Sequence, residues 1–575
     1  MSIGLLALVA LVPILIALVL MVGLRMGAMK AMPIAWAACA LSAFFVWKLP
    51  VDYIAALSIQ GAINAVGVLI IVFGALLLLH TLQASGGMET IQYGMQGVSK
   101  DMRVQGIIIG YMFGAFIEGS AGFGTPAALA APFLLALGYP PLAAAVLALI
   151  FNSFSVAFGA VGVTLLVGMG TAIKTSLATV IAAGVFPDEY SGIKHIGETI
   201  TLMHAPMIYI LPVFALGFIT RLFGPNRSWA DGFAAWKFCF FAATAFIIPF
   251  FLMAWFFGPE LPSMIGGLVG LGIIIAGAKK GFCVPKDVWT FGDPHKWEST
   301  WTGALAFDHK AEYKPRMSQF MAWLPYIIIG IILMSTRNNF LPFKAWLNAY
   351  GEIRFVDILG FKGVNEGLKL LYIPGILPFM LVSLLVIPLH GMSLDKAAKA
   401  WLETAVKMKA ATIALLFSVA LVAIFRGSGA NPDPAIVSAI AAGTAQKMPS
   451  MPLALATATA GMLGSIWPMF ASYIGGLGAF ITGSHTVSNM LFGQFQWDMA
   501  GQLNLPKVVI LGCQSAGGAM GNMVCIHNII AACTVVGLVD REGEILKKTV
   551  IPFILYGLAV GTVALILLSM GFGKF

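Results

Sequence analysis

Two stretches of the chain combine one ionisable side chain with glycines and hydroxyls in otherwise apolar surroundings. Residues 116–125 read FIEGSAGFGT and residues 480–489 read FITGSHTVSN, so the pattern Phe-Ile-x-Gly-Ser occurs twice. Glycines let the backbone approach a ligand closely, and Pro126 suits the first turn of a helix whose free N–H groups point back to the break. Each stretch is therefore a candidate anion site.

The composition places both stretches in a membrane protein. Of the 575 residues, 59% are hydrophobic and 10% are charged, whereas a soluble domain carries about 25% charged residues. Mean hydropathy is +0.93. At least ten apolar runs approach the length of about 20 residues that spans a bilayer. We therefore predict an all-α polytopic membrane protein.

Basic residues in the loops predict the orientation of the chain. The net charge is +9, and residues 279–316 alone carry seven Lys or Arg, which places this loop in the cytoplasm by the positive-inside rule. The positive charge is attributed to such loops and not to nucleic-acid binding. Residues 337–369 are external by the count of spans, although they also carry basic residues. The first apolar run, residues 3–24, is interpreted as a retained helix, because no basic segment precedes it.

The two glycine-rich stretches lie in regions that behave as repeats. Gly119 corresponds to Gly483 and Pro140 to Pro506, so the offset changes only from 364 to 366 residues. The helices that precede and follow the two regions are expected to cross the membrane in opposite directions. We predict inverted-topology repeats with discontinuous or re-entrant helices that meet at the membrane midplane, which lets one site face the two sides alternately.

The repeats divide the chain into four predicted parts. These are two N-terminal transmembrane helices in residues 1–53, the first inverted repeat in 54–221, connecting scaffold helices with the basic cytoplasmic loop in 222–408, and the second inverted repeat in 409–575. The soluble loops are too small for a nucleotide-binding domain, which argues against an ATP-driven pump. The sequence lacks HExxH, GxSxG and GxxxxGKS/T motifs, so no enzymatic activity is expected. The six cysteines form no CxxC pair, and neither a metal site nor a cofactor is expected.

Glycines, hydroxyls and amides near the two breaks are predicted to bind the substrate. Together they could hold a carboxylate and a neighbouring hydroxyl group. The alternative for the glycines is a close helix crossing, and for the amides hydrogen bonding between helices. The candidates are Gly119, Ser120, Gly122, Gly124, Thr125, Asn152, Ser153, Gly483, Ser484, Thr486, Ser488, Asn489, Gln514, Ser515 and Asn522.

The few ionisable residues of these regions are functional candidates, because each is costly inside a membrane. Glu118 is the predicted proton carrier, with a fixed ion pair as the alternative. His485 is the second candidate for proton coupling, since histidine titrates near physiological pH. Arg426 could clamp a carboxylate or extend to the outer interface. Asp433 is expected to cap a helix, and His527 could be a hydrogen-bonded core histidine.

Long motifs in both regions resemble the bacterial lactate permease family. They are GSAGFGTPAALAAP at 119–132, LGYP at 137–140, FNS at 151–153, TGSHTVSN at 482–489 and IIAACTVVGL at 529–538. The resemblance implies secondary import of L-lactate, D-lactate or glycolate with protons across a bacterial or archaeal cytoplasmic membrane. Where the family is expected to carry aspartate or asparagine this sequence has His485, and where some members carry lysine it has Asn522, so the cation and the particular acid stay open.

The sequence thus predicts a proton symporter for a small 2-hydroxy monocarboxylate, embedded in a lipid bilayer. One alternative is a sodium-coupled carboxylate symporter, since unwound carbonyls together with Ser, Thr and Asn oxygens can coordinate Na⁺. The other is a passive anion channel, which would conduct anions without accumulating them.

Overall fold

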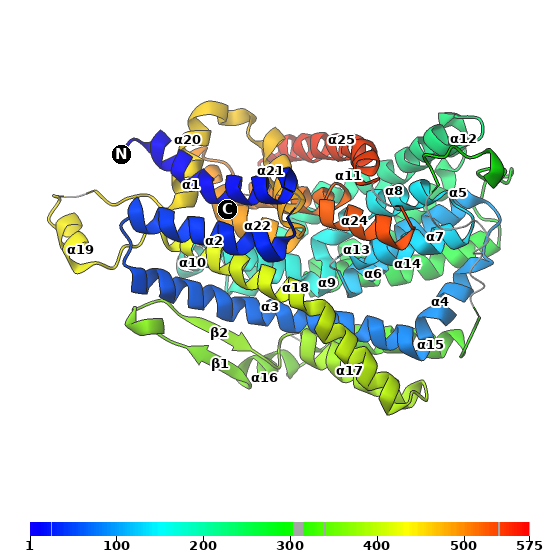
Figure 1. Cartoon of the computed structure of the whole chain (residues 1–575), viewed down its shortest axis with the longest axis horizontal. Helices are drawn as coiled ribbons and strands as arrows, with labels where there is room; N and C mark the ends of the chain where they lie inside the picture. The colour runs from blue at the N-terminus through cyan, green and yellow to red at the C-terminus, as the bar shows by residue number, and fades with distance from the viewer. Residues whose placement is uncertain are drawn as a thin grey trace.

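The protein is built almost entirely from helices (Figure 1). The computed structural model describes residues 1–24, 26–122, 124–302, 314–337, 341–444, 446–538 and 541–573. Eleven helices among these residues are long and apolar enough to cross a membrane, which confirms an all-α polytopic membrane protein. Two parts of predicted features lie outside the described residues, namely Phe123 in the first glycine-rich stretch and 303–313 in the basic loop.

Two long helices, α3 (Val51–Ser85) and α18 (Leu394–Gly427), pack along each other in opposite directions. Near one end, a Cβ on Gly61 would lie 2.6 Å from the backbone of α18 at Ala420. Towards the other end, the His80 ring nitrogen Nδ1 lies 2.8 Å from the Thr404 hydroxyl. The opposite directions agree with the topology expected for these helices, while the repeat boundaries stay a prediction.

Helix α18 is one continuous helix of 34 residues. Its sequence contains no glycine or proline before Gly427, so nothing interrupts the helical hydrogen bonds.

The first irregular region is a series of short helices and breaks. The segment from α5 through η2 to α6 is continuous and ends at Ser120, and α7 returns from this point. The turn after α7 lies beside the start of α5, because the Tyr139 hydroxyl donates to the Met102 carbonyl. This part of the chain therefore enters and returns on one side. The bounds are α5 (Met102–Gln105), η2 (Gly106–Phe113), α6 (Gly114–Ser120), α7 (Thr125–Ala136), α8 (Pro141–Phe151), η3 (Phe154–Phe158), α9 (Gly159–Val163), η4 (Thr164–Met169), α10 (Gly170–Ala182) and α11 (Glu189–Phe223).

The second irregular region has a similar order of elements. Helix α21 runs to a break at Gly483, α22 returns, and α23 leads to a second break near Asn522. The bounds are α19 (Pro434–Ala441), α20 (Met451–Leu463), η9 (Gly464–Ile466), α21 (Pro468–Thr482), α22 (His485–Gln502), α23 (Lys507–Met520), η10 (Gly521–Met523), α24 (Ile526–Val535) and α25 (Glu542–Ser569).

The remaining elements surround these two regions. A two-stranded antiparallel hairpin, which the sequence did not predict, pairs β1 with β2. The bounds are α1 (Ile3–Leu18), η1 (Val19–Gly23), α2 (Ala28–Phe45), α4 (Gly87–Gln96), α12 (Trp229–Phe233), α13 (Trp236–Leu252), η5 (Met253–Phe257), α14 (Pro262–Lys279), η6 (Pro294–Lys296), α15 (Gln319–Arg337), α16 (Phe343–Ala349), β1 (Glu352–Phe355), η7 (Ile358–Gly360), β2 (Glu366–Lys369), η8 (Gly375–Met380) and α17 (Leu381–Leu389).

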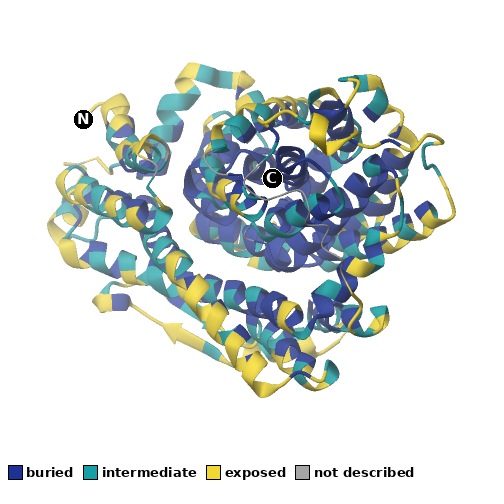
Figure 2. Ribbon diagram, turned by 45° about the vertical axis from the view of Figure 1, so that its right-hand side comes forward, coloured by how far each residue is buried: buried dark blue, intermediate teal, exposed yellow. Residues whose placement is uncertain are grey.

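The buried core consists of the broken helices (Figure 2). Every residue of α8 is buried, and so is α23 after its first residue. By contrast, the outer helices present large apolar side chains, such as Leu8 of α1 and Phe256 of η5, which are 63% and 73% exposed. An apolar exterior suits contact with lipid, so these outer helices are suited to face the bilayer.

Candidate substrate-binding site

The two glycine-rich breaks face each other across a small cavity. We call the break between α6 and α7 the first tip and the break between α21 and α22 the second tip. Left-handed glycines form both turns, with φ of 62° at Gly122, 77° at Gly124 and 73° at Gly483. The cavity measures about 20 Å³, room for one water molecule. Its lining comprises Glu118, Gly122, Val156, Gly159, Ala160, Thr164, Gly483, Ser484, His485, Thr486 and Asn522.

Glu118 places a carboxyl group in this cavity without a cation beside it. The side chain is only 2% exposed, and its Oε2 atom has no hydrogen-bond partner among the described residues. Its Oε1 atom lies against Gly159, where an added Cβ would come within 2.3 Å. Within the part of the chain that the structure describes, Glu118 forms no ion pair. A buried carboxyl with a free oxygen is a group that can take up a proton.

His485 joins the second tip to the first irregular region. Its Nδ1 atom lies 3.2 Å from the Val156 carbonyl oxygen, and its Nε2 atom lies 3.1 Å from the Ser515 hydroxyl. The Asn489 side-chain nitrogen is also 3.0 Å from Nε2. Because a carbonyl only accepts, Nδ1 must carry the hydrogen, and Nε2 then accepts from its neighbours. Both ring nitrogens are therefore occupied in the neutral imidazole.

Several buried polar atoms on or next to η3 and α22, two elements that contribute residues to the cavity lining, lack partners among the described residues. They are both side-chain atoms of Asn152, the Ser155 hydroxyl and the Asn489 Oδ1 atom. The Asn489 nitrogen, by contrast, donates to the Thr164 carbonyl at 3.0 Å and so bridges the two irregular regions. Buried polar groups are normally hydrogen-bonded, so a local group of unsatisfied atoms is a feature of a ligand site.

Comparisons with known proteins identify the family of this chain. Residues 6–571 match the family model described as L-lactate permease. The chain belongs to the L-lactate permease family. A Haemophilus influenzae protein, named provisionally as an L-lactate permease, is 31% identical over 87% of this chain and 86% of its own length. The glycolate permease GlcA of Escherichia coli K12 is 28% identical over 98% of this chain and 96% of its own. The L-lactate permease of Bacillus subtilis 168 is 27% identical over 88% and 86%.

Membership of a permease family, together with eleven spans among the described residues, makes the chain a multi-pass transport protein of the bacterial inner membrane.

The predicted site residues of this permease fall into three groups. Those that line the cavity are Glu118, Gly122, Gly483, Ser484, His485, Thr486 and Asn522.

The second group comprises residues near the first tip and the end of α8 that do not line the cavity, and it includes Asn152. The hydroxyls of Ser120, Thr125 and Ser153 donate to carbonyls three residues earlier in the chain, at 3.1, 2.7 and 2.9 Å. Gly119 packs against α14, where an added Cβ would lie 2.2 Å from a backbone nitrogen, and Gly124 lies against Asn528. These residues shape the first tip.

The third group belongs to a hydrogen-bond network between α21, α22 and α23. Gln514 donates to the carbonyl and the hydroxyl of Ser488, both at 3.3 Å, and accepts from Gln496 at 3.2 Å. Gln496 in turn accepts from the Trp467 indole at 2.9 Å. Ser515 and Asn489 connect this region to His485. The network fixes the helices that carry the second tip.

Asn528 is a site residue that the sequence reasoning missed. Its amide donates to Asn522 Oδ1 at 2.9 Å, while its own oxygen lies 2.6 Å from the position of a Cβ on Gly124. It therefore connects the Asn522 wall of the cavity with the first tip. A second asparagine six residues after Asn522, in an apolar run, was the available signal.

The second missed feature is a left-handed backbone turn that lines the cavity. Ala160, Val161 and Gly162 have φ of 45°, 56° and 74°. This conformation is costly for alanine and more so for the β-branched valine, so the surrounding packing must impose it. Gly162 lies against Pro259, and the turn reverses the chain between η3 and η4. Strained backbone of this kind is concentrated at functional sites.

The other ionisable candidates lie away from the cavity lining. Arg426, at the end of α18, is partly buried and donates to the Thr171 carbonyl. Asp433 caps α19 through a bond from the Ala435 amide at 2.8 Å, which confirms the expected role. His527 is exposed, so the expectation of a core histidine was wrong. Its Cβ atom lies 3.3 Å from the position that a Cβ on Gly483 would take.

Proposed function

We propose that this permease imports a small 2-hydroxy monocarboxylate, namely L-lactate, D-lactate or glycolate, by proton symport. The observation that carries the proposal is the unpaired Glu118 carboxyl in a cavity formed by both tips. The names of the relatives, lactate and glycolate permeases, support the substrate class.

The substrate carboxylate would lie where the first turns of α7 and α22 converge. Both helices begin at a tip, which would direct their positive dipole ends towards the cavity. Ser484, Thr486 and Asn522 add polar side chains there. A cavity of about 20 Å³ is too small for lactate, so the tips must separate by a small amount to admit it.

Glu118 is the preferred proton carrier of the two predicted residues. Its Oε2 atom is free, whereas both nitrogens of His485 are already engaged. A proton bound at Glu118 beside the substrate carboxylate would cancel one negative charge, which makes the loaded crossing less costly. His485 would mainly hold the second tip against the first irregular region.

Sodium coupling is a second candidate, because the unpartnered oxygens of Asn152, Ser155 and Asn489 are of the type that Na⁺ prefers.

The experiment that tests the proposed function is uptake of labelled L-lactate into proteoliposomes with an inward proton gradient and no sodium. Accumulation above equilibrium that a protonophore abolishes would support proton symport. Accumulation that requires sodium would show that sodium is the coupling cation instead of the proton. Flux that only equilibrates the anion would indicate a channel.

A further inference from the structure

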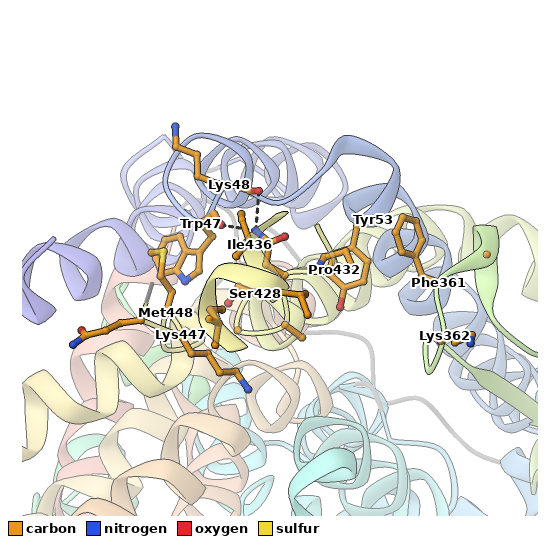
Figure 3. A pocket seen from close by; sticks show the side chains of 17 residues that line it. Trp47, Lys48, Tyr53, Phe361, Lys362, Ser428, Pro432, Ile436, Lys447 and Met448 are labelled. Atoms are coloured by element: carbon orange, nitrogen blue, oxygen red, sulfur yellow. Dashed lines mark hydrogen bonds between the residues drawn. The ribbon is translucent and has the colours of Figure 1, made fainter. Parts of the chain in front are cut away.

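A large hollow opens on the face of the protein that the topology predicts to be external. It measures about 880 Å³ and is formed by the turn between α2 and α3, the tip of the β1–β2 hairpin, and residues from 428–440 and 446–448 (Figure 3). Trp47, Phe361 and Ile436 are among its apolar walls. This hollow is separate from the cavity between the tips, with which it shares no lining residue.

The charge around this hollow is positive. Lys48, Lys362 and Lys447 extend from the three segments that form it (Figure 3), and none of its described lining residues is acidic. None of the three lysines has an ion-pair partner among the described residues. The nearby carboxylates of Asp433 and Asp357 accept bonds from backbone amides instead. The lysine charges are thus available to an anion from solution.

A second hollow, of about 390 Å³, continues from the first towards the protein interior. The two share Tyr53, Lys362 and Ala430, and the second adds Arg426 and one carboxylate, Asp498, to the lining. Asp498 accepts a hydrogen bond from Gln494 at 2.8 Å, and the basic residues of the two hollows outnumber it. Arg426 donates one N–H group to the Thr171 carbonyl. Because a guanidinium carries five N–H donors, others remain for a ligand.

The inner wall of the second hollow belongs to helices that lead to the candidate site. Gln494 lies on α22, nine residues after His485, which corresponds to about 14 Å along the helix. Thr175 lies on α10, which continues from the η4 segment that begins at cavity residue Thr164. The hollows therefore end on the two elements that emerge from the cavity.

The lysines stand on a face where basic residues are disfavoured. The positive-inside rule concentrates Lys and Arg in short cytoplasmic loops, yet the segments around these hollows are assigned to the opposite side. A role in attracting anions accounts for them, because a cleft lined by one sign of charge raises the local concentration of the opposite ion.

We propose that the two hollows form an outer vestibule that captures the carboxylate anion, with the three lysines attracting it and Arg426 making the first fixed contact. A guanidinium can bind a carboxylate with two parallel hydrogen bonds, which suits the inner position. This inference rests on the proposed import of a monocarboxylate, but the charge of the vestibule can be measured without transport.

The first test measures that charge directly. Val437 lines the outer hollow and is 50% exposed, so Val437→Cys offers a thiol there. Five of the six native cysteines are buried, and the sixth, Cys283, is partly exposed and lines neither hollow. The unsubstituted protein supplies the background rate. The ratio of labelling rates for a sulfonate and a trimethylammonium methanethiosulfonate is expected to fall about tenfold when K48Q/K362Q/K447Q is added at low salt.

The second test asks whether transport uses this charge. At low ionic strength K48Q/K362Q/K447Q should raise KM for labelled L-lactate by about three- to tenfold with little change in kcat, and high salt should remove the difference. The matched control is K279Q/K396Q/K399Q, which removes three exposed lysines from the other face. It should change neither KM nor the labelling ratio.

Three results would overturn the vestibule. They are a labelling ratio that neutralisation leaves unchanged, a ratio that falls while KM stays the same, and a control triple variant that shifts both as strongly. Failure of the proposed function would look different. The unsubstituted protein would then transport no small monocarboxylate, while the labelling ratio would still decide whether the hollows attract anions.

Discussion

The two tips have related sequences but different hydrogen-bonding states. The first tip leaves a buried carboxyl atom, Glu118 Oε2, without a partner among the described residues. At the second tip His485 uses both ring nitrogens and Ser484 caps α22, while the Asn489 Oδ1 atom one turn further along α22 is the buried atom without a partner among the described residues. Repetition of a motif therefore does not imply equal roles. The first tip is suited to exchanging a proton, and the second tip to holding the geometry of the cavity.

The strongest way to break this comparison is Glu118→Gln. The amide cannot carry the proton, so uphill accumulation of L-lactate should be lost, while counterflow exchange continues because the binding groups remain. Accumulation and counterflow in proteoliposomes measure the two effects. Glu542→Gln is the matched control, since this partly buried carboxyl of α25 lines neither the cavity nor the two hollows and should leave accumulation intact. Loss of both activities in a well-folded E118Q protein would give Glu118 a structural role.

A second substitution, His485→Gln, acts on the second tip. It removes the ring from Val156, Asn489 and Ser515, and should lower the free energy of unfolding by about 1–3 kcal/mol. Transport should slow, yet the remaining uptake should still respond to the proton gradient. Thermal unfolding in detergent and gradient-driven uptake together measure this. A stable H485Q protein without proton coupling would reverse the assigned roles.

The backbone of the first tip can be tested with Gly122→Ala. A Cβ there would lie 2.8 Å from the Cβ of Ala160, at a φ of 62°, so the turn should shift and uptake should fall severalfold. The backbone strain alone costs about 1–2 kcal/mol. Gly184→Ala is the control, because Gly184 has a φ of 77° with nothing within 4 Å. Equal loss of uptake in both variants would show that packing at the tip is unimportant.

The smallest effect is expected from Ser488→Ala, which sharpens the distinction between cavity and network. The variant removes one partner of Gln514, and it should cost about 1 kcal/mol of stability while KM for L-lactate changes less than twofold. Unfolding and initial uptake rates provide the measurements. A large rise in KM would mean that Ser488 contacts the substrate after all.

The sequence was sufficient to predict the fold class and the positions of the two tips. Hydropathy predicts the spans, and the repeated Phe-Ile-x-Gly-Ser motif predicts two breaks in apolar surroundings; the structure brings Glu118 and His485 to one cavity. These features are readable because they depend on local composition. Glycine at a left-handed position, as at Gly483, leaves the same kind of local signal.

Features set by tertiary packing could not be predicted in this way. Val161 adopts a left-handed conformation that its residue type disfavours, so only its surroundings explain the turn. Likewise, the hydroxyl of Thr125 returns to its own backbone, and Gln514 bonds to a neighbouring helix instead of lining the cavity. Sequence identifies polar residues near a break, but their direction depends on helix rotation and neighbours.

The central claim, that the first tip carries the proton and the second holds the cavity, is tested most directly by proton flux. A pH-sensitive dye inside proteoliposomes reports protons entering as L-lactate is added outside, without an imposed gradient. The account predicts internal acidification with the unsubstituted protein and with H485Q in proportion to the lactate taken up, and none with E118Q during exchange. Acidification by E118Q, or its absence in H485Q during measurable lactate uptake, would contradict the account.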